Sequence, residues 1–371
     1  MILRQYRFKM LSLIGRMKKH LRASVTWIYL IFLFLLASTF LTVLNYHQNR
    51  LRRSLNNPND EKSAELRQLI VDLEKESFSR NLGVDEVCRK NIGGKIPRRN
   101  VITDPPSNII VDLERKLLYC EVPKAACSSW KQFFFQLRGM NVTKGINGKA
   151  KKELTHLHQL STEQRKEALN SFIKFMVTRH PFSRVLSAFR NKIQPNGSYE
   201  RLNQNWQPYH WRERVGQYII EQYRGKDVAM EMMKDKSKYD VTFSEFVRFL
   251  GEFPDHKAAN DLHWTDINSL CYPCDVRYDT IVKFENMAKE SLLIFEKAGI
   301  ENRLPSLTQH ATNSSDLSQA VEFYRDIPRD VIRKLYERYY YDFTVFGYDA
   351  NLFCDDITVN NINYQLITIH G

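Results

Sequence analysis

The chain has 371 residues, of which 43% are apolar and 12% aromatic, enough to bury the core of one large globular domain. Its formal net charge is +13, but residues 1–24 hold many basic side chains and no acid, so the rest is only modestly basic. A modest basic excess suits anionic ligands. The composition disfavours nucleic acid as a partner, because no recognised nucleic-acid-binding motif accompanies the charge.

Residues 25–44 carry no charge and predict a membrane anchor. This run of 20 residues is about the length that crosses the hydrocarbon core of a bilayer. The basic residues 1–24 ahead of it favour a cytosolic tail and an uncleaved signal anchor over a cleaved signal peptide. Arg50, Arg52 and Arg53 on the far side weaken the charge asymmetry. We expect a single-pass type II protein whose remaining residues are lumenal.

Residues 45–107 are predicted to form a stem between the anchor and the folded domain. Within them, residues 63–77 place apolar side chains at helical spacing. This pattern predicts a short amphipathic helix that could pair with a copy of itself, giving a homodimer, or lie on the domain. The loop-forming stretches GGKIPRR and TDPPS follow, so we expect a lumenal domain over residues 108–354 and a C-terminal tail over residues 355–371.

Residues 117–138, LLYCEVPKAACSSWKQFFFQLR, predict a strand, a turn that begins at Pro123, and a helix. We expect the first turn of this helix to hold Lys124, Ser128 and Ser129. Such a turn aims free backbone N–H groups and the positive end of a helix dipole at one point, which suits a phosphate. The ammonium and the hydroxyls add donors for phosphoryl or sulfuryl oxygens. GxxxxGK[ST] is absent, so this is no Walker loop, and an ordinary core strand with a capped helix is the alternative.

Residues 172–192, FIKFMVTRHPFSRVLSAFRNK, repeat the arrangement. An apolar run ends at Arg179, His180 and the following proline break it, and a helix with Arg184 and Ser187 is expected next. One basic turn between a strand and a helix is common. Two in one domain indicate a ligand with two separated anionic groups.

These two segments resemble the two nucleotide-binding signatures of Golgi carbohydrate sulfotransferases, in the branch of the chondroitin and dermatan 4-O-sulfotransferases and the HNK-1 sulfotransferase. Residues 263–287, HWTDINSLCYPCDVRYDTIVKFENM, are similar to the HW, LCxPC and YDxxxKFE pattern of that branch. The resemblance spans about residues 115–350. It implies an α/β fold with a P-loop-like parallel sheet flanked by helices. It also implies 3′-phosphoadenylyl sulfate (PAPS) as the sulfo donor and no metal.

The resemblance also implies the roles of the residues in both turns. Lys124 is expected to meet the charge that grows on the leaving oxygen, where positioning and electrostatics do most of the catalysis. Arg179 and Ser187 are expected to hold the 3′-phosphate, whereas Arg184 is either a further ligand or an exposed helix charge. His180 departs from the acidic residue that relatives often have there, and so alters the local charge. The expected donor-binding set is Pro123, Lys124, Ala125, Ala126, Cys127, Ser128, Ser129, Trp130, Arg179, Arg184 and Ser187.

A histidine suits the role of general base, because its unperturbed pKa of about 6.5 lies near a mildly acidic Golgi pH. His156 and His158 form an H-x-H pair between the two signatures, where some related enzymes place a catalytic histidine. His263 in the third block is the other candidate, and an acidic residue stays open. The predicted catalytic residues are therefore Lys124, His158 and His263.

All six cysteines follow the expected anchor, so a lumenal domain permits disulfides, although the sequence does not choose their pairing. A zinc set of His256, His263, Cys271 and Cys274 can be drawn, but an oxidising lumen favours a disulfide for C-x-P-C, and we predict no metal. Three N-x-[ST] sequons predict glycosylation of a lumenal glycoprotein at Asn141, Asn196 and Asn313.

Three further stretches carry weaker signals. Residues 200–225 interleave aromatic side chains such as Trp211 with arginines, which suits stacking on sugar rings, although a helix packed by its aromatics is the favoured alternative. Residues 241–250 predict a core helix after a threonine cap. Residues 320–346 predict a further helical stretch rich in tyrosine.

The resemblance implies a Golgi membrane enzyme that moves a sulfo group from PAPS to a sugar hydroxyl. The favoured acceptor is O-4 of GalNAc in chondroitin or dermatan, which makes a glycosaminoglycan the expected partner. One alternative is a sulfotransferase that acts on glucuronyl or GalNAc termini of N-glycans. Another is a catalytically inactive Golgi glycan-binding protein on the same fold, although such a protein would not need the nucleotide-binding residues.

Overall fold

The computed structural model describes residues 61–91, 96–142, 144–195, 211–235, 238–300 and 317–353. The chain divides into two compact units, Met1–Leu69 and Ile70–Gly371, and the features below lie in the second. The expected tail 1–24, anchor 25–44 and C-terminal tail 355–371 lie outside the described residues. Among the helices that can be described, none combines the length and the apolar character required to cross a bilayer.

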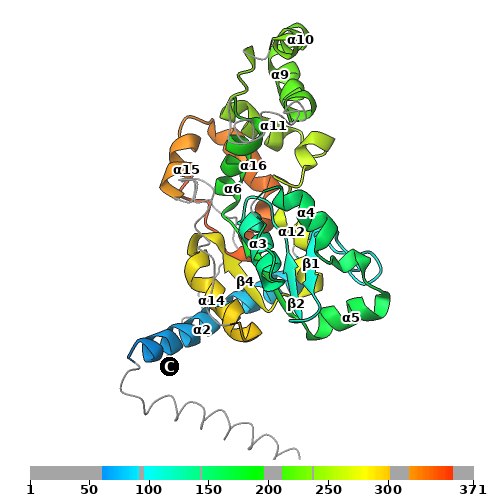
Figure 1. The fold of residues 1–371 in the computed structure, drawn as a ribbon. Coiled ribbons are helices and arrows are strands. Elements are labelled where there is room, and N and C mark those ends of the chain that lie inside the picture. Colours follow the sequence, from blue (N-terminus) through cyan, green and yellow to red (C-terminus); the bar gives the residue numbers. More distant parts are fainter. Residues whose placement is uncertain are drawn as a thin grey trace, which may run out of the picture. The chain divides into compact units, whose positions relative to one another are not determined.

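Four short strands form the central sheet in the order β1-β2-β3-β4 (Figure 1). Strands β2, β3 and β4 run parallel, whereas β1 pairs antiparallel with β2. The connection between β1 and β2 is too short for the crossover that a parallel pair requires. The expected parallel sheet is therefore confirmed for three strands and wrong for the edge strand. The strands are β1 (Ile109–Asp112), β2 (Leu117–Cys120), β3 (Ile173–Thr178) and β4 (Thr280–Lys283).

Both predicted segments of strand, turn and helix are present. Strand β2 leads into α3 (Cys127–Leu137), and β3 leads into α6 (Pro181–Ala188). Parallel strands bring their carboxyl ends to one edge of the sheet, so both turns lie at that edge, where open α/β sheets bind ligands. Between β2 and β3 the chain also forms α4 (Ile146–Glu153), the 3-10 turn η2 (Leu157–Gln159) and α5 (Thr162–Ser171).

An aromatic core joins the sheet to its flanking helices. The ring of Trp130 on α3 lies 4.8 Å from that of Phe175 on β3, and Tyr119 on β2 lies 5.0 Å from the same ring. Phe295 on α14 (Met287–Ala298) completes the contact at 6.0 Å from Trp130. Rings at these separations in tilted or stacked arrangements stabilise a core beyond the area that they bury.

A second apolar cluster surrounds α6 and is formed by helices. The expected helix near residues 241–250 is confirmed as α11, with a capping box in which Thr242 Oγ1 accepts from the Glu245 amide at 3.2 Å. The expected stretch 320–346 divides into three helices. In Figure 1, α6, α11, α15 and α16 gather together. The helices are α9 (Gln217–Arg224), α10 (Lys226–Lys234), α11 (Phe243–Glu252), α15 (Leu317–Tyr324), α16 (Arg329–Arg338) and α17 (Tyr340–Phe346).

Short helical turns fill the remaining connections. The two π-helical turns are η3 (Phe189–Ile193) and η4 (Arg212–Gly216). The others are η6 (Lys257–Asn260), α12 (Ile267–Cys271), α13 (Pro273–Val276) and η7 (Phe284–Asn286).

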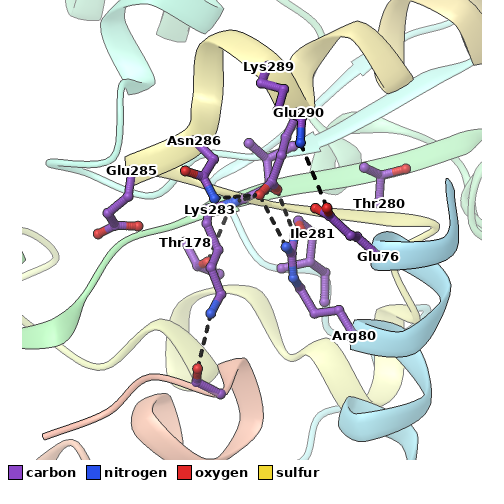
Figure 2. A network of polar contacts seen from close by, with 12 residues as sticks. Glu76, Arg80, Thr178, Thr280, Ile281, Lys283, Glu285, Asn286, Lys289 and Glu290 are labelled. Atoms are coloured by element: carbon purple, nitrogen blue, oxygen red, sulfur yellow. Dashed lines mark hydrogen bonds and ion pairs between the residues drawn. The ribbon is translucent and has the colours of Figure 1, made fainter. Parts of the chain in front are cut away.

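The expected short helix over residues 63–77 is part of the much longer α2 (Glu61–Lys90). From Ile70 onward α2 belongs to the same compact unit as the sheet, and Cys88 near its end is disulfide-bonded to Cys274. Figure 2 shows Arg80 on α2 reaching Glu290 on α14, with a nitrogen-to-oxygen distance of 2.7 Å. This part of α2 therefore lies on the domain, one of the two predicted alternatives.

Candidate active site

The loop between β2 and α3 is shaped to receive an anion. Lys124 and Ala126 both adopt left-handed backbone conformations, with φ of 71° and 59°. Residues other than glycine rarely adopt this conformation, and such strain is found at functional sites. Left-handed residues beside right-handed ones turn successive amides toward one concave face, an arrangement known as an anion-binding nest. Because α3 begins at Cys127, the amides of Cys127 and Ser128 have no intrahelical acceptor.

The loop residues fall into two groups by exposure. Lys124, Cys127, Ser128 and Ser129 are half-buried. Lys124 precedes α3 rather than lying in its first turn as expected, because the helix begins three residues later. Pro123 and Ala125 are buried, and so is Trp130, whose indole packs in the aromatic core. The expected contact of the Trp130 side chain with the donor therefore has no support from its position.

Arg179, between β3 and α6, links the second turn to the first. Its Nη1 donates to the carbonyl oxygen of Lys124 at 2.9 Å, and its guanidinium lies 4.4 Å from the centre of the Phe284 ring. Burial lowers its pKa to about 10, so it remains charged near neutral pH. Ser187 is buried two turns along α6 from Arg179. Both residues proposed to hold the 3′-phosphate thus lie on the same segment.

Arg184 is only 1% exposed, so the alternative of an exposed helix charge is wrong. Its Nε donates to the Pro123 carbonyl at 3.0 Å, and its Nη2 donates to the Leu262 carbonyl at 3.1 Å. Its Nη1 donates to the Thr265 carbonyl at 2.5 Å. Each of its three nitrogens therefore binds the main chain, and the predicted contact with a phosphate gains no support.

His263 and Asp261 form a hydrogen-bonded pair beside this loop. The His263 Nδ1 lies 2.7 Å from the Asp261 Oδ1, and the ring contacts Trp211 edge-on with centres 5.1 Å apart. A proton on Nδ1 that is donated to the carboxylate leaves Nε2 as the basic nitrogen. Burial lowers the pKa of His263 to about 4, with the charges of Lys192 and Lys124 adding to the shift and Asp261 opposing it. The ring is therefore neutral and able to accept a proton near neutral pH.

Two lysines make the site strongly cationic. Burial, together with the positive charges of Arg179, Lys192 and Arg184, lowers the pKa of Lys124 to about 8. Burial likewise lowers the pKa of Lys192 to about 8, and its Nζ lies 5.1 Å from the centre of the Trp211 ring. The cations that lower the pKa of Lys124 favour an anionic ligand, which relieves their repulsion.

Sequence reasoning missed Lys192 and Asp261 as site residues. Lys192 ends the second signature, and Asp261 stands two residues before His263, so both lie in or beside segments that the resemblance had singled out. Trp211 is buried against His263, which agrees with the favoured alternative of aromatic packing rather than an open sugar platform.

The H-x-H pair, His156 and His158, lies on η2 and the residue before it, in another segment than His263. His156 is buried, bridges to Ile110 beside the sheet, and has Nδ1 2.9 Å from the Leu154 carbonyl oxygen. His158 is exposed on η2. Arg179 instead binds the Lys124 carbonyl, and the charge of Lys124 acts on the His263 ring. The geometry thus favours His263 over His158 as the base, although both assignments stay predictions.

His180 is a neutral residue where relatives often have an acidic one, so the expected change in local charge is the loss of a negative charge. Burial lowers its pKa, and its ring stacks on Phe353 with centres 5.0 Å apart. Its Nε2 lies 3.0 Å from the Asp349 carbonyl oxygen, and its amide donates to Glu285 Oε1 at 2.8 Å. The ring is therefore neutral and held in the core.

Both cysteines of the C-x-P-C motif are in disulfides, as its pattern favoured. Cys271 is bonded to Cys120 at the end of β2, and Cys274 to Cys88. The alternative zinc set thus lacks its thiolates, and the part of the chain that can be described holds no group of metal-ligating side chains. Of the three sequons, Asn141 begins one on an exposed turn after α3, whereas Asn196 and Asn313 lie outside the described residues.

Residues 107–349 match the model of the sulfotransferase family. The chain belongs to the sulfotransferase family. It is 29% identical over 275 residues to carbohydrate sulfotransferase 11 of Mus musculus, covering 72% of this chain and 74% of that protein. It is 32% identical over 244 residues to carbohydrate sulfotransferase 14 of Danio rerio, covering 65% and 62%. It is 30% identical over 275 residues to carbohydrate sulfotransferase 9 of Homo sapiens, covering 71% and 58%.

No solved structure is significantly similar to this sulfotransferase. Membership of the family confirms the resemblance inferred from the three sequence blocks and the predicted enzyme class. It also implies PAPS as the donor of the sulfo group. The cationic loop, with its free amides and hydroxyls, fits a ligand that carries phosphate and sulfate groups.

Proposed function

We propose that this sulfotransferase moves a sulfo group from PAPS to a carbohydrate hydroxyl, with Lys124 and His263 on either side of the reaction. The observation that carries the proposal is the sharing of Arg184 by two loops. Its guanidinium binds the carbonyls of Pro123 and Leu262, and these residues immediately precede Lys124 and His263. The segment that carries the cation for the leaving group and the segment that carries the base for the acceptor are thus joined by one side chain.

Each residue has a role that follows from its position. PAPS supplies the sulfo group and a phosphate leaving group. The Lys124 ammonium stabilises the negative charge that grows on the leaving oxygen, and Ser128 and Ser129 donate to the phosphosulfate. His263 Nε2 accepts the proton of the sugar hydroxyl, while Asp261 holds the ring and stabilises the imidazolium that forms.

The binding of an anionic donor changes the charge around His263. In the free protein the charges of Lys124 and Lys192 help to lower the pKa of His263, after burial. Negative charge on the donor offsets these ammonium charges, so the basicity of His263 rises once the donor is bound. The base is therefore strengthened when a transferable group is present.

The proposed acceptor is O-4 of GalNAc in chondroitin or dermatan. This choice rests on the resemblance of the three blocks to the 4-O-sulfotransferase branch, and on the names of the relatives, which are carbohydrate sulfotransferases. A polyanionic acceptor also suits a cationic site. The N-glycan termini considered above are the alternative acceptors.

We place the protein in the Golgi membrane as a single-pass type II protein with a lumenal catalytic domain. The uncharged run 25–44 behind a basic tail supports this location. The two disulfides among the described residues also support it, because structural disulfides persist in oxidising compartments.

The test separates an enzyme from a glycan-binding protein on the same fold. The full-length protein in detergent is assayed for binding of 3′,5′-ADP and chondroitin, and for sulfo transfer from PAPS. We expect both ligands to bind, and we expect Lys124→Ala to abolish transfer while chondroitin binding persists. A wild-type protein that binds chondroitin but neither binds 3′,5′-ADP nor transfers sulfate would contradict the proposal.

A further inference from the structure

We propose that Arg184 is a positioning residue, which fixes the loop of Lys124 relative to the segment of His263 without touching the donor. The inference rests on the proposed function, because it assigns a role within that reaction. It replaces the sequence-based expectation that Arg184 is either a phosphate ligand or a surface charge.

The geometry of the guanidinium carries the inference. From the first turn of α6, Arg184 donates to the Pro123 carbonyl on one side and to the Leu262 and Thr265 carbonyls on the other. These acceptors lie 61, 78 and 81 residues from Arg184 in the sequence. One rigid, planar cation therefore ties together three segments that are distant along the chain.

The linkage extends to the two reacting groups. Arg179, just before α6, donates to the Lys124 carbonyl, so Arg179 and Arg184 bind the consecutive carbonyls of Lys124 and Pro123. The Leu262 and Thr265 carbonyls flank His263, which is held in turn by Asp261. Displacement of the guanidinium would therefore change the position of Lys124 relative to His263.

A lysine cannot replace this arrangement. The guanidinium presents several N–H donors in a fixed plane, whereas an ammonium is a compact point charge on a flexible stem. Burial lowers the pKa of Arg184, but the carboxylates of Asp342 and Asp266 favour its charged form. Asp342 in turn accepts from the Ile267 amide at 2.8 Å, which anchors the chain immediately beyond Thr265.

The chain offers a matched control in Arg165. Its three guanidinium nitrogens also donate to backbone carbonyls, those of Leu157, Ile102 and His158, at 3.2, 3.0 and 2.9 Å. None of these acceptors adjoins Lys124 or His263 in the sequence. Replacing Arg165 removes a similar set of hydrogen bonds and leaves the proposed reacting groups in place.

The experiment compares Arg184→Lys with Arg165→Lys in the full-length protein. For Arg184→Lys we expect kcat for sulfo transfer to fall about 100-fold, as misplaced reacting groups do, while the Kd of 3′,5′-ADP changes less than about threefold. For Arg165→Lys we expect an unchanged kcat and a smaller loss in melting temperature, because Arg165 is half-buried whereas Arg184 is buried. Guanidinium ion added to Arg184→Ala should restore part of the lost kcat.

Three outcomes would overturn the proposal. A Kd for 3′,5′-ADP that rises as steeply as kcat falls would make Arg184 a phosphate ligand. Equal losses of kcat in both variants would make the role of Arg184 purely structural. An unchanged kcat in Arg184→Lys would show that Arg184 does not position the reacting groups.

Folding and activity controls keep the test decisive. Should Arg184→Lys not fold, Arg184→Gln retains a planar donor without a buried charge. If neither folds while Arg165→Lys does, Arg184 is a folding residue and the proposal falls. A wild-type protein without transfer activity would instead contradict the proposed function.

Discussion

Arg179 donates a hydrogen bond from Nη1 to the carbonyl oxygen of Lys124 at 2.9 Å. The arginine proposed to hold the 3′-phosphate therefore also holds the backbone of the lysine proposed to serve the leaving group. The Arg179 side chain thus connects the two parts of the expected donor site, because it reaches from the second turn to the backbone of the first. A donor that engages Arg179 thereby acts on the loop that carries Lys124.

Replacing Arg179 should impair recognition of the 3′-phosphate in particular. Arg179→Ala removes a charged donor, and a hydrogen bond to a charged group contributes about 1.5–3 kcal/mol, so the Kd of 3′,5′-ADP should rise roughly 10- to 100-fold. Isothermal titration with 3′,5′-ADP and with 5′-AMP checks this, since the second nucleotide lacks the 3′-phosphate and serves as the control. Equal losses of affinity for both nucleotides would show that Arg179 does not read the 3′-phosphate.

The two histidine candidates can be separated by paired substitutions. His263→Gln should lower kcat by about 100-fold or more, the usual contribution of a general base, whereas His158→Gln should leave kcat unchanged. The reason is that His263 stands beside the lysine cluster and His158 is exposed on η2. The measurement is the initial rate of sulfo transfer at saturating PAPS. A large loss in His158→Gln with normal activity in His263→Gln would reverse the assignment.

The dependence of kcat/KM on pH should be bell-shaped with widely separated limbs. Protonated His263 cannot accept a proton, so activity should rise with pH through its pKa of about 4. Neutral Lys124 cannot offset the leaving charge, so activity should fall as pH passes its pKa of about 8. Initial rates at concentrations of PAPS and acceptor well below their KM, from pH 3 to pH 10, check both limbs, and Lys124→Arg should move the alkaline limb to higher pH. An alkaline limb that stays in place in Lys124→Arg would assign that limb to another group, such as Lys192.

The pair between Arg80 and Glu290 should stabilise the domain. The two side chains are 15% and 6% exposed, and removing one partner of such a buried pair costs about 3–5 kcal/mol. Figure 2 also shows Glu76 on α2 near Lys289 on α14. Their charged atoms are 3.8 Å apart, and both side chains are about half exposed. We therefore expect Glu290→Ala to lower the free energy of unfolding by about 3 kcal/mol, and the control Glu76→Ala by less than about 1 kcal/mol.

The effect of Glu290 should depend on pH in a defined direction. Burial opposes its ionisation, but the guanidinium of Arg80 prevails and lowers the pKa of the carboxyl below its ordinary value. A carboxyl whose pKa is lowered by folding contributes stability above its unfolded pKa and loses it as pH falls through the folded pKa. In urea unfolding, the difference in free energy of unfolding between wild type and Glu290→Ala should be present at pH 7 and much smaller in acid. A difference in free energy of unfolding that grew in acid would contradict the stabilising ion pair of Arg80 and Glu290.

The two basic turns could be predicted because their signals are local. Apolar runs, the proline after His180 and the positions of Lys124 and Ser128 appear within short windows of sequence, and the family resemblance added the ligand. The capped helix after Thr242 was predicted for the same reason. Its side-chain cap and its glutamate lie three residues apart.

What the sequence did not predict depends on contacts between distant residues. Arg184 was predicted to be either a phosphate ligand or an exposed helix charge, because its actual acceptors lie 61 to 81 residues away in the sequence. Trp130 was assigned to the donor by its place in the motif, yet the helix turns its ring into the aromatic core. The antiparallel direction of β1 follows from a short connection, which the apolar pattern of the strand does not reveal.

The most direct test of the account is sulfo transfer from radiolabelled PAPS by the full-length protein onto chondroitin, dermatan, heparosan and glucuronyl-capped N-glycans, followed by disaccharide analysis. We predict label in 4-sulfated GalNAc with the wild-type protein and none with Lys124→Ala. Label on N-glycan termini alone would keep the sulfotransferase and replace the acceptor. Absence of label from every glycan, together with no binding of 3′,5′-ADP, would contradict the central claim that this site transfers sulfate.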